Sequence, residues 1–518
     1  MSALQSVDFH AVAPVLALGG GALAVLVADL FLPPARRWLA MPLALAATLT
    51  ALVAAVTLVP GRPHPTFCTP ATTLPAAVGG ARVPASCSYV VDGFALLFQV
   101  VVLATLAIVL LLGLSGAREA RLPAGEYHLM LLCSATGMVT IAASRDLLTL
   151  FISLELLSVP AFVLAGLRRH DARSSEAALT FFLVGVVSSA VTLFGIGLTY
   201  GLTGSLHFDR IALQLARPDV RGAPAAAAVV LTLVGFAFKV SAVPFHTWAP
   251  DTYTGAPIPV ATFLSVASKA SGFAGLLAVL LGAFRPYADV WGPVVAVLAV
   301  ATMVVGNVVA LQQRHAVRLL AWSSVAQSGY MLVPLGVAAS ARGRAESLDT
   351  ALSATLAYVA IYAAMNLGAF ACVAAVARRS PRNLIEDYRG LARASPLLAV
   401  ALGFFLLCLA GAPPGLAGLF AKLVVFRATI DGGVAWLGVV MALATVVGLA
   451  YYVRFTALLF AGPDERADAR TAGVAPARAE VPGTLRAAIG VAAAAALVIG
   501  VVPQLVLHVA PLSTLAAR

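Results

Sequence analysis

The chain has 518 residues, of which 61% are hydrophobic and only 11% are charged. A soluble protein of this length needs far more charge to cover its surface, so most of this surface must face lipid. The formal net charge of +11 does not indicate nucleic-acid binding, because the arginines stand in short loops between apolar runs and form no basic domain.

Apolar stretches that are long enough to cross a bilayer as a helix recur from one end of the chain to the other. The sequence therefore predicts an all-α, polytopic membrane protein of about fourteen transmembrane helices. We expect the first stretch to be a retained helix rather than a cleaved signal. Proline and glycine mark many of the breaks. The predicted helices are 12–31, 38–59, 93–115, 127–143, 147–167, 176–201, 225–246, 258–283, 288–311, 316–340, 350–377, 396–427, 434–460 and 483–508.

These helices divide into an N-terminal segment, two repeats and a C-terminal helix. Helices one to three occupy residues 1–126. The first five-helix repeat, helices four to eight, occupies residues 127–283, and the second, helices nine to thirteen, occupies residues 288–460. Residues 461–482 form a charged internal loop, and the last helix lies within residues 483–518.

Two similar segments indicate that the repeats are related by inversion. "GFAFKVSAVPF" spans residues 235–245 and "GLFAKLVVF" spans residues 418–426, and each places a lysine in an apolar helix near a proline. Proline-interrupted helices in the two halves of a chain are typical of inverted-repeat transporters. We therefore expect helices seven and twelve to be broken, at Pro244 and at Pro413-Pro414.

The distribution of arginine predicts the orientation. Fourteen spans place both termini on one side of the membrane. With both termini outside, nineteen of the thirty arginines fall in inner loops or at inner helix ends. Cytoplasmic loops carry an excess of basic residues, so this count favours external termini.

The loop of residues 60–92 is then external, and it contains Cys68 and Cys87. An oxidising exterior permits a disulfide between them, with two unpaired cysteines as the alternative. The other three cysteines lie in apolar helices, where they are expected to be small core residues. No CxxC motif or Cys/His cluster in the sequence indicates a metal or iron–sulfur site.

Lysine and arginine are used differently along the chain. The basic residues of the predicted loops are arginines, whereas Lys239, Lys269 and Lys422, the three lysines, lie inside predicted membrane helices. A charge at mid-membrane costs at least ~2.5 kcal/mol. Arginine stays protonated in proteins, whereas burial can bring the pKa of a lysine towards neutrality. We interpret the lysines as proton carriers; snorkelling or static ion pairs are the alternatives.

The predicted partner carboxylate is Glu155, the acid predicted nearest to the middle of a helix. A protonated, structural glutamate is the alternative. Broken helices free backbone carbonyls, which the membrane tolerates only where they are buried in protein or face water. Water could therefore reach the lysines near Pro244, Pro413 and Pro414. His246 adds a titratable group near the inner surface, with an interfacial hydrogen bonder as the alternative.

At these residues the sequence resembles a known family. "FKVSAVPFHTWAPDTYTGAPIPVATFLSVASKASGFA", residues 238–274, closely resembles the signature of the antiporter-like, proton-pumping membrane subunits of respiratory complex I, NADH:quinone oxidoreductase. "SLELLSVPAFVLAG" (153–166), "VRLLAWSSVAQSGYM" (317–331) and "LAGAPPGLAGLFAKLVVF" (409–426) resemble further stretches of that family. Two of its three paralogous subunits carry histidine where this chain has Lys269, so the chain resembles subunit N, called subunit 2 in mitochondria.

The resemblance implies a role for each core residue. Glu155 and Lys239 would form the ion pair of the fifth and seventh helices. Lys269 would be the central carrier on the eighth helix, and Lys422, on the broken twelfth helix, would face the proton exit.

The resemblance also implies partners and location. The chain would be a translocase subunit in a bacterial cell membrane, with other complex I subunits as partners and with FMN, iron–sulfur clusters and quinone in those partners. It departs from the family pattern at Thr180 and Val317, where lysine is common, which puts an additional cationic relay on the sixth helix in doubt. The alternatives are a subunit of a multi-subunit monovalent cation/proton antiporter and a scaffold whose ionisable residues are relics.

Overall fold

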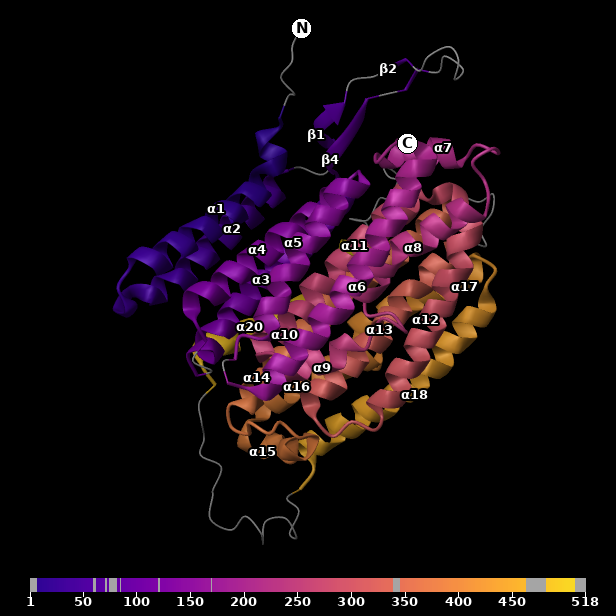
Figure 1. The fold of residues 1–518 in the computed structure, drawn as a ribbon. Coiled ribbons are helices and arrows are strands. Elements are labelled where there is room, and N and C mark those ends of the chain that lie inside the picture. The colour runs from indigo at the N-terminus through magenta and orange to yellow at the C-terminus, as the bar shows by residue number, and fades with distance from the viewer. Residues whose placement is uncertain are drawn as a thin grey trace.

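The computed structural model describes residues 7–58, 62–69, 72–73, 82–83, 85–119, 122–168, 170–338, 345–462 and 481–507. These residues form one tilted bundle of helices (Figure 1). Most of the predicted loop 461–482 and part of the predicted loop 60–92 lie outside the described residues. The same holds for Arg121, Arg169, Arg466, Arg470 and Arg478, which contributed to the predicted orientation.

The described helices make fourteen passes when each interrupted helix is counted once, as the sequence predicts. Ten are both long and apolar enough to cross a membrane by length and composition. The uninterrupted passes are α1 (Phe9–Phe31), α2 (Ala40–Thr57), α3 (Gly93–Glu119), α4 (Ala124–Ala143), α5 (Leu147–Ala165), α6 (Ala172–Thr203), α12 (Ala288–Ala310), α13 (Ala316–Ala338), α14 (Ala345–Ala377), α18 (Ala435–Phe460) and α20 (Gly483–Val501).

The seventh and twelfth passes are broken, as predicted. The seventh consists of α8 (Ala223–Lys239) and α9 (Trp248–Gly255), and the twelfth of α16 (Pro396–Ala410) and α17 (Leu416–Asp431). The predicted range 225–246 is wrong at its C-terminal end: α8 stops at Lys239, and the second half of the broken helix lies in what was predicted as a loop. Pro244, which has no backbone N–H to continue a helix, lies between the two halves.

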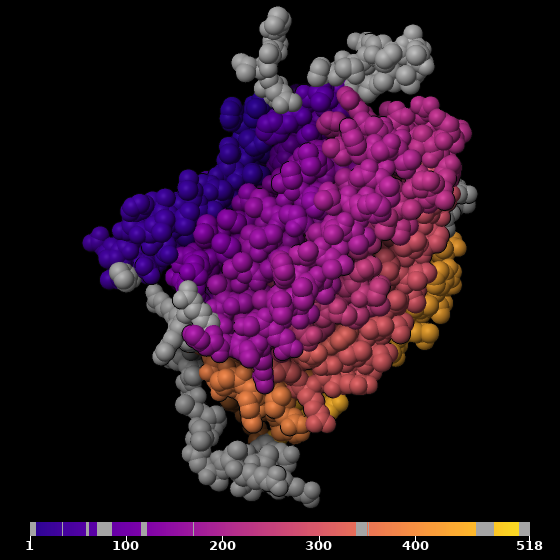
Figure 2. All heavy atoms as spheres, in the orientation of Figure 1, coloured from indigo at the N-terminus to yellow at the C-terminus, as the bar shows by residue number. Residues whose placement is uncertain are grey.

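The eighth pass is the most enclosed. It runs through α10 (Ile258–Phe263), a π-helical turn η3 (Leu264–Ser268), α11 (Lys269–Ala278) and a second π-helical turn η4 (Val279–Ala283). The most apolar stretch of this pass is fully buried inside the bundle, whereas only about a third of the corresponding stretches of α2 and α6 is buried. Figure 2 shows the contrast at the edge, where α1 and α2, in indigo, project from the rest of the molecule.

A small β-hairpin, which the sequence did not predict, lies at one end of the bundle (Figure 1). Strands β1 (His64–Thr69) and β4 (Ser86–Val91) pair antiparallel and place Cys68 opposite Cys87, and the two cysteines form a disulfide. Strands β2 (Thr72–Thr73) and β3 (Arg82–Val83) extend the hairpin. The remaining short elements are η1 (Pro34–Leu39), α7 (Phe208–Leu215), η5 (Arg285–Tyr287), η6 (Ile385–Tyr388), α15 (Leu391–Ala394) and α21 (Gln504–Leu507).

Candidate proton path

The three lysines are buried inside the bundle. Lys239, Lys269 and Lys422 are 1%, 2% and 4% exposed. None of them reaches solvent or the outer surface, so snorkelling does not describe their position. Each lies beside an interruption of a helix, where backbone carbonyls lack their usual helical partners.

Lys239 is the last residue of α8. The sequence placed it in the middle of a helix, which is wrong because the helix ends there. Its Nζ donates a 2.9 Å hydrogen bond to Ser158 Oγ of α5 and lies 5.5 Å from the centre of the Phe181 ring. The negative end of a helix dipole and an aromatic ring both favour a cation at this place.

Glu155 lies one turn before Ser158 on α5, so both side chains occupy the same face. Its Oε1 accepts a 2.6 Å hydrogen bond from Ser189 Oγ of α6. Among the described residues, Glu155 and Lys239 do not form the direct ion pair that the resemblance implies. Each instead contacts a serine hydroxyl, Glu155 that of Ser189 and Lys239 that of Ser158.

Lys269 directly follows the π-helical turn η3. Its Nζ donates hydrogen bonds of 2.6 Å to the carbonyl oxygen and to Oγ of Ser324 on α13. Tyr362 of α14 donates a 2.8 Å hydrogen bond to the same Oγ. In the described structure no carboxylate contacts Lys269, and the centre of the Tyr362 ring lies 5.9 Å from its Nζ.

Lys422 spans the break of the twelfth pass. From α17, its Nζ donates a 2.6 Å hydrogen bond to the carbonyl oxygen of Ala410, the last residue of α16. Pro413 and Pro414 lie in the break, as predicted. Gly411 also lies there, with φ of 75°, and a Cβ at this position would be 2.9 Å from Cδ of Lys422. The side chain of Lys422 therefore occupies space that a larger residue at position 411 would reduce.

Two polar side chains one turn apart on α13 make contacts near Lys269 and near Lys422. Ser324 contacts Lys269, and one turn later Gln327 donates a 3.1 Å hydrogen bond to the carbonyl oxygen of Leu409, next to the Ala410 carbonyl that binds Lys422. Gln327 also accepts a 2.7 Å hydrogen bond from Tyr358 and donates to Tyr452. Ser324 and Gln327 were not among the predicted site residues, although the polar residues in "SSVAQS" are spaced to lie on one face of a helix.

The region around the broken seventh pass contains buried polar atoms without a hydrogen-bond partner among the described residues. They include Oγ of Ser241, two residues after Lys239, and Oγ of Ser268, next to Lys269. Buried polar atoms that lack protein partners ordinarily bind ordered water. Predicted site residue His246 is also buried, and its ring lies edge-on to Trp322, whose indole N–H is another such atom.

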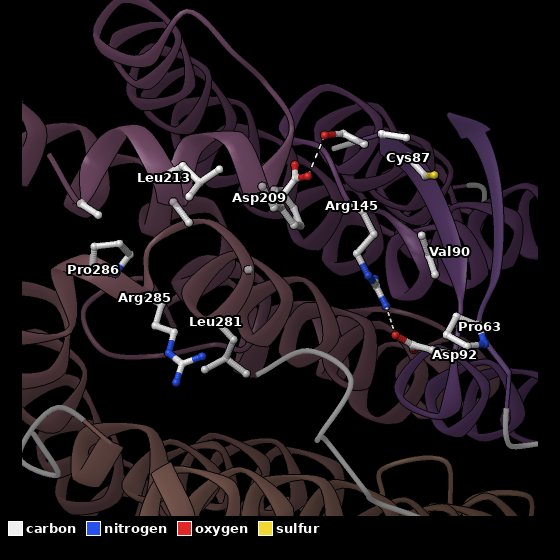
Figure 3. Close-up of a pocket in the computed structure, with 16 residues that line it drawn as sticks. Pro63, Cys87, Val90, Asp92, Arg145, Asp209, Leu213, Leu281, Arg285 and Pro286 are labelled. Carbon is white, nitrogen blue, oxygen red and sulfur yellow. Dashed lines mark hydrogen bonds and ion pairs between the residues drawn. The ribbon is translucent and has the colours of Figure 1, made fainter. Parts of the chain in front are cut away.

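A cavity of about 520 Å³ lies at the hairpin end of the eighth pass (Figure 3). Arg145 and the buried Asp92 form an ion pair of 2.7 Å at its wall, and Asp209 accepts a 2.6 Å hydrogen bond from Ser86. Gly282, at the end of the eighth pass, also lines the cavity. In the described part of the chain, no group of three or more His, Cys, Asp or Glu could hold a metal ion.

Comparison with known proteins gives the family. The family described as NADH:quinone oxidoreductase/Mrp antiporter, TM matches residues 144–448. NADH-quinone oxidoreductase subunit N 2 of Streptomyces griseus subsp. griseus is 50% identical over 99% of this chain and 95% of its own length. Subunit N of Salinispora tropica is 46% identical over 89% of this chain and 86% of its own length.

Solved structures agree with this assignment. A chain of respiratory complex I from Thermus thermophilus matches with a TM-score of 0.74 and 31% identity, over 96% of this chain and 98% of that one. A chain of the Mrp complex from Dietzia has a TM-score of 0.80 at 22% identity, covering 98% of this chain and 96% of that one, and shows the shared fold. The chain therefore belongs to the antiporter-like membrane subunits of respiratory complex I, of the subunit N type.

Proposed function

We propose that this chain carries protons across the membrane along its buried lysines, as a subunit of NADH:quinone oxidoreductase. The supporting observation is that α13 contacts Lys269 through Ser324 and, one turn later, places Gln327 at the Leu409 carbonyl, next to the Ala410 carbonyl that binds Lys422. A proton reaches Lys269 from the cytoplasm past the broken seventh pass and the buried His246. It then moves along Ser324 and Gln327 with water to Lys422, and is released outside.

The Glu155–Lys239 pair controls this step through its field. Both groups contact serine hydroxyls, which can turn to donate or accept. When the carboxylate approaches the ammonium group, it offsets the charge of Lys239. When the two groups separate, the uncompensated charge of Lys239 favours loss of the proton from Lys269, because like charges repel strongly in a low-dielectric interior.

The energy for this cycle comes from redox chemistry in other subunits. We propose that this chain performs no electron transfer itself and that FMN, iron–sulfur clusters and quinone are bound by partner subunits of the complex. Its orientation follows from arginine counting, with both termini outside the bacterial cell membrane. The two five-helix units of residues 127–283 and 288–460 then supply the intake and the release half of the path.

Substitution of the central lysine tests the proposal. In complexes reconstituted into liposomes, Lys269→Met should leave assembly intact and abolish most of the proton pumping, measured with a pH-sensitive dye while NADH oxidation is followed separately. The methionine keeps an unbranched side chain of similar shape and removes the group that carries the proton. Normal pumping together with normal quinone reduction would contradict the mechanism.

The alternative function is a subunit of a monovalent cation/proton antiporter. The likeness to the Mrp complex concerns the fold alone, whereas the relatives of 50% and 46% identity are subunits N. Affinity purification through a tag on this chain, followed by mass spectrometry, separates the two functions. We expect flavin- and iron–sulfur-bearing subunits to be found. Small antiporter subunits without redox proteins would instead indicate that the same residues serve in a cation exchanger.

A further inference from the structure

Asn307 is a buried amide in an otherwise apolar stretch of helix. It lies in the run "MVVGNVVA" near the end of α12 and is 1% exposed. An amide that is removed from water must find hydrogen-bond partners inside the protein, because an unsatisfied polar group there is destabilising. Both polar atoms of Asn307 have such partners, and two of these partners belong to other helices.

The amide of Asn307 joins α12 to α13 and α18. Its Nδ2 donates hydrogen bonds of 2.8 Å to the Met303 carbonyl of its own helix and of 3.0 Å to the hydroxyl oxygen of Tyr330 on α13. Its Oδ1 accepts a 3.1 Å hydrogen bond from the hydroxyl of Tyr451 on α18. Gly448 of α18 leaves room for this contact, since a Cβ there would lie 3.0 Å from Oδ1. The hydroxyl end of Tyr330 is therefore held from α12.

The ring of Tyr330 faces Lys422. The Nζ atom of Lys422 lies 5.1 Å from the centre of this ring, within the range in which a cation is attracted to an aromatic face. Tyr330 is buried, and burial strengthens such a contact. The ring thus adds to the stabilisation that the Ala410 carbonyl gives to the ammonium group. The carbonyl is fixed by the backbone, whereas the place of the ring depends on its packing and on the hydrogen bond at its hydroxyl.

We propose that Asn307 is a positioning residue for proton transfer, because it holds the ring of Tyr330 against Lys422. The inference rests on the proposed proton path through Lys422. Asn307 acts through Tyr330 and carries no proton itself. Without the hydrogen bond between the amide and the hydroxyl, the ring stabilises the ammonium group less well, and Lys422 accepts fewer protons per turnover.

A double-mutant cycle in complexes reconstituted into liposomes tests this proposal. The measurement is the number of protons pumped per NADH oxidised by the assembled complex. Tyr330→Leu removes the ring and should abolish most of the pumping. Tyr330→Phe keeps the ring and should lower the ratio only about twofold, because the cation–π contact is weakened and not removed.

Asn307→Leu should lower the ratio by a similar factor. The variant that combines Asn307→Leu with Tyr330→Phe should pump no worse than either single variant, because both changes break the same hydrogen bond. Losses that add up in the combined variant would show that Asn307 acts independently of Tyr330.

Tyr388→Phe is the matched control. Its hydroxyl donates to Oδ1 of Asn383, so the change also removes a buried hydrogen bond between tyrosine and asparagine. This bond lies at η6, outside the helices that carry the lysines. Tyr388→Phe should therefore keep the proton-to-NADH ratio of the parent complex.

Lys422→Met separates this inference from the proposed function. It should pump poorly, and normal pumping by this variant would contradict the proposed path and the inference with it. If Lys422→Met does pump poorly, three results would each overturn the positioning role alone. They are equal ratios for Tyr330→Leu and Tyr330→Phe, additive losses in the combined variant, and a ratio for Asn307→Leu that equals that of Tyr388→Phe.

Discussion

Lys422 of α17 donates its hydrogen bond to the carbonyl of Ala410, so the ammonium group of one half-helix lies at the C-terminal end of the other. The last carbonyls of a helix carry a partial negative charge and lack helical partners. The break in the twelfth pass therefore creates a place where a buried cation is stabilised without a carboxylate.

Gly411→Ala should disturb this contact. A Cβ there would lie 2.9 Å from Cδ and 3.3 Å from Nζ of Lys422, and the residue has a φ of 75°. We expect a loss of about 1–2 kcal/mol of stability from the left-handed backbone and, in addition, a lower proton-to-electron ratio. Gly433→Ala is the matched control, because Gly433 has a φ of 72° and open space around its Cα. Equal pumping by the two variants would contradict a role for the Lys422 position.

Gln327→Leu should interrupt the path between Lys269 and Lys422. The substitution removes hydrogen bonds with the Leu409 carbonyl, Tyr358 and Tyr452, and leaving each buried group unsatisfied costs about 1–3 kcal/mol. Pumping should fall more than quinone reduction in reconstituted complexes. Gln313→Leu makes the same change in the loop after α12, where the side chain donates its hydrogen bond to the Val309 carbonyl at the end of that helix. A Gln327 variant that pumps like the Gln313 variant would exclude this route.

Ser189→Ala should reduce proton pumping in the same way as loss of the Glu155 carboxylate, but to a smaller extent. The hydroxyl donates a 2.6 Å hydrogen bond to the carboxylate, whereas the hydroxyl of the neighbouring Ser188 donates to the Val184 carbonyl of its own helix. Hydrogen bonds to charged groups contribute about 1.5–3 kcal/mol, so pumping by Ser189→Ala should be clearly reduced and pumping by Ser188→Ala unchanged. If Glu155→Gln impairs pumping and Ser189→Ala does not, the Ser189 hydroxyl has no part in the control of proton transfer by the Glu155–Lys239 pair.

His315 predicts a dependence of stability on pH. Burial, together with the positive charges of Arg173 and Arg318, lowers the pKa of this loop histidine. A lowered folded pKa favours the neutral form, so its contribution to stability is present above the unfolded pKa of about 6.5 and is lost as the pH falls below it. Thermal unfolding of the complex at pH 7.5 and pH 5.5 should show a smaller acid effect for His315→Gln. The same acid effect in both proteins would contradict this.

Much of the fold and the burial of the three lysines could be predicted from the sequence, because long apolar runs show which segments cross the membrane and all three lysines lie within such runs. The end of α8 at Lys239 could not, since the run "GFAFKVSAV" remains apolar through the break. The serines that contact Glu155 and Lys239 depend on packing between α5, α6 and α8, which has no local signal. The β-hairpin was not predicted, because its strands β1 and β4 pair across the loop that separates them in the sequence.

Lys269→Arg tests the central claim most directly. Arginine keeps a permanent positive charge at the contact with Ser324 and cannot release a proton. The measurement is the number of protons pumped per NADH oxidised by the complex in liposomes, compared with the parent complex. If Lys269 carries protons, the ratio should fall as it does for Lys269→Met, with assembly intact. A ratio equal to that of the parent complex would show that only the charge is needed and would contradict the account.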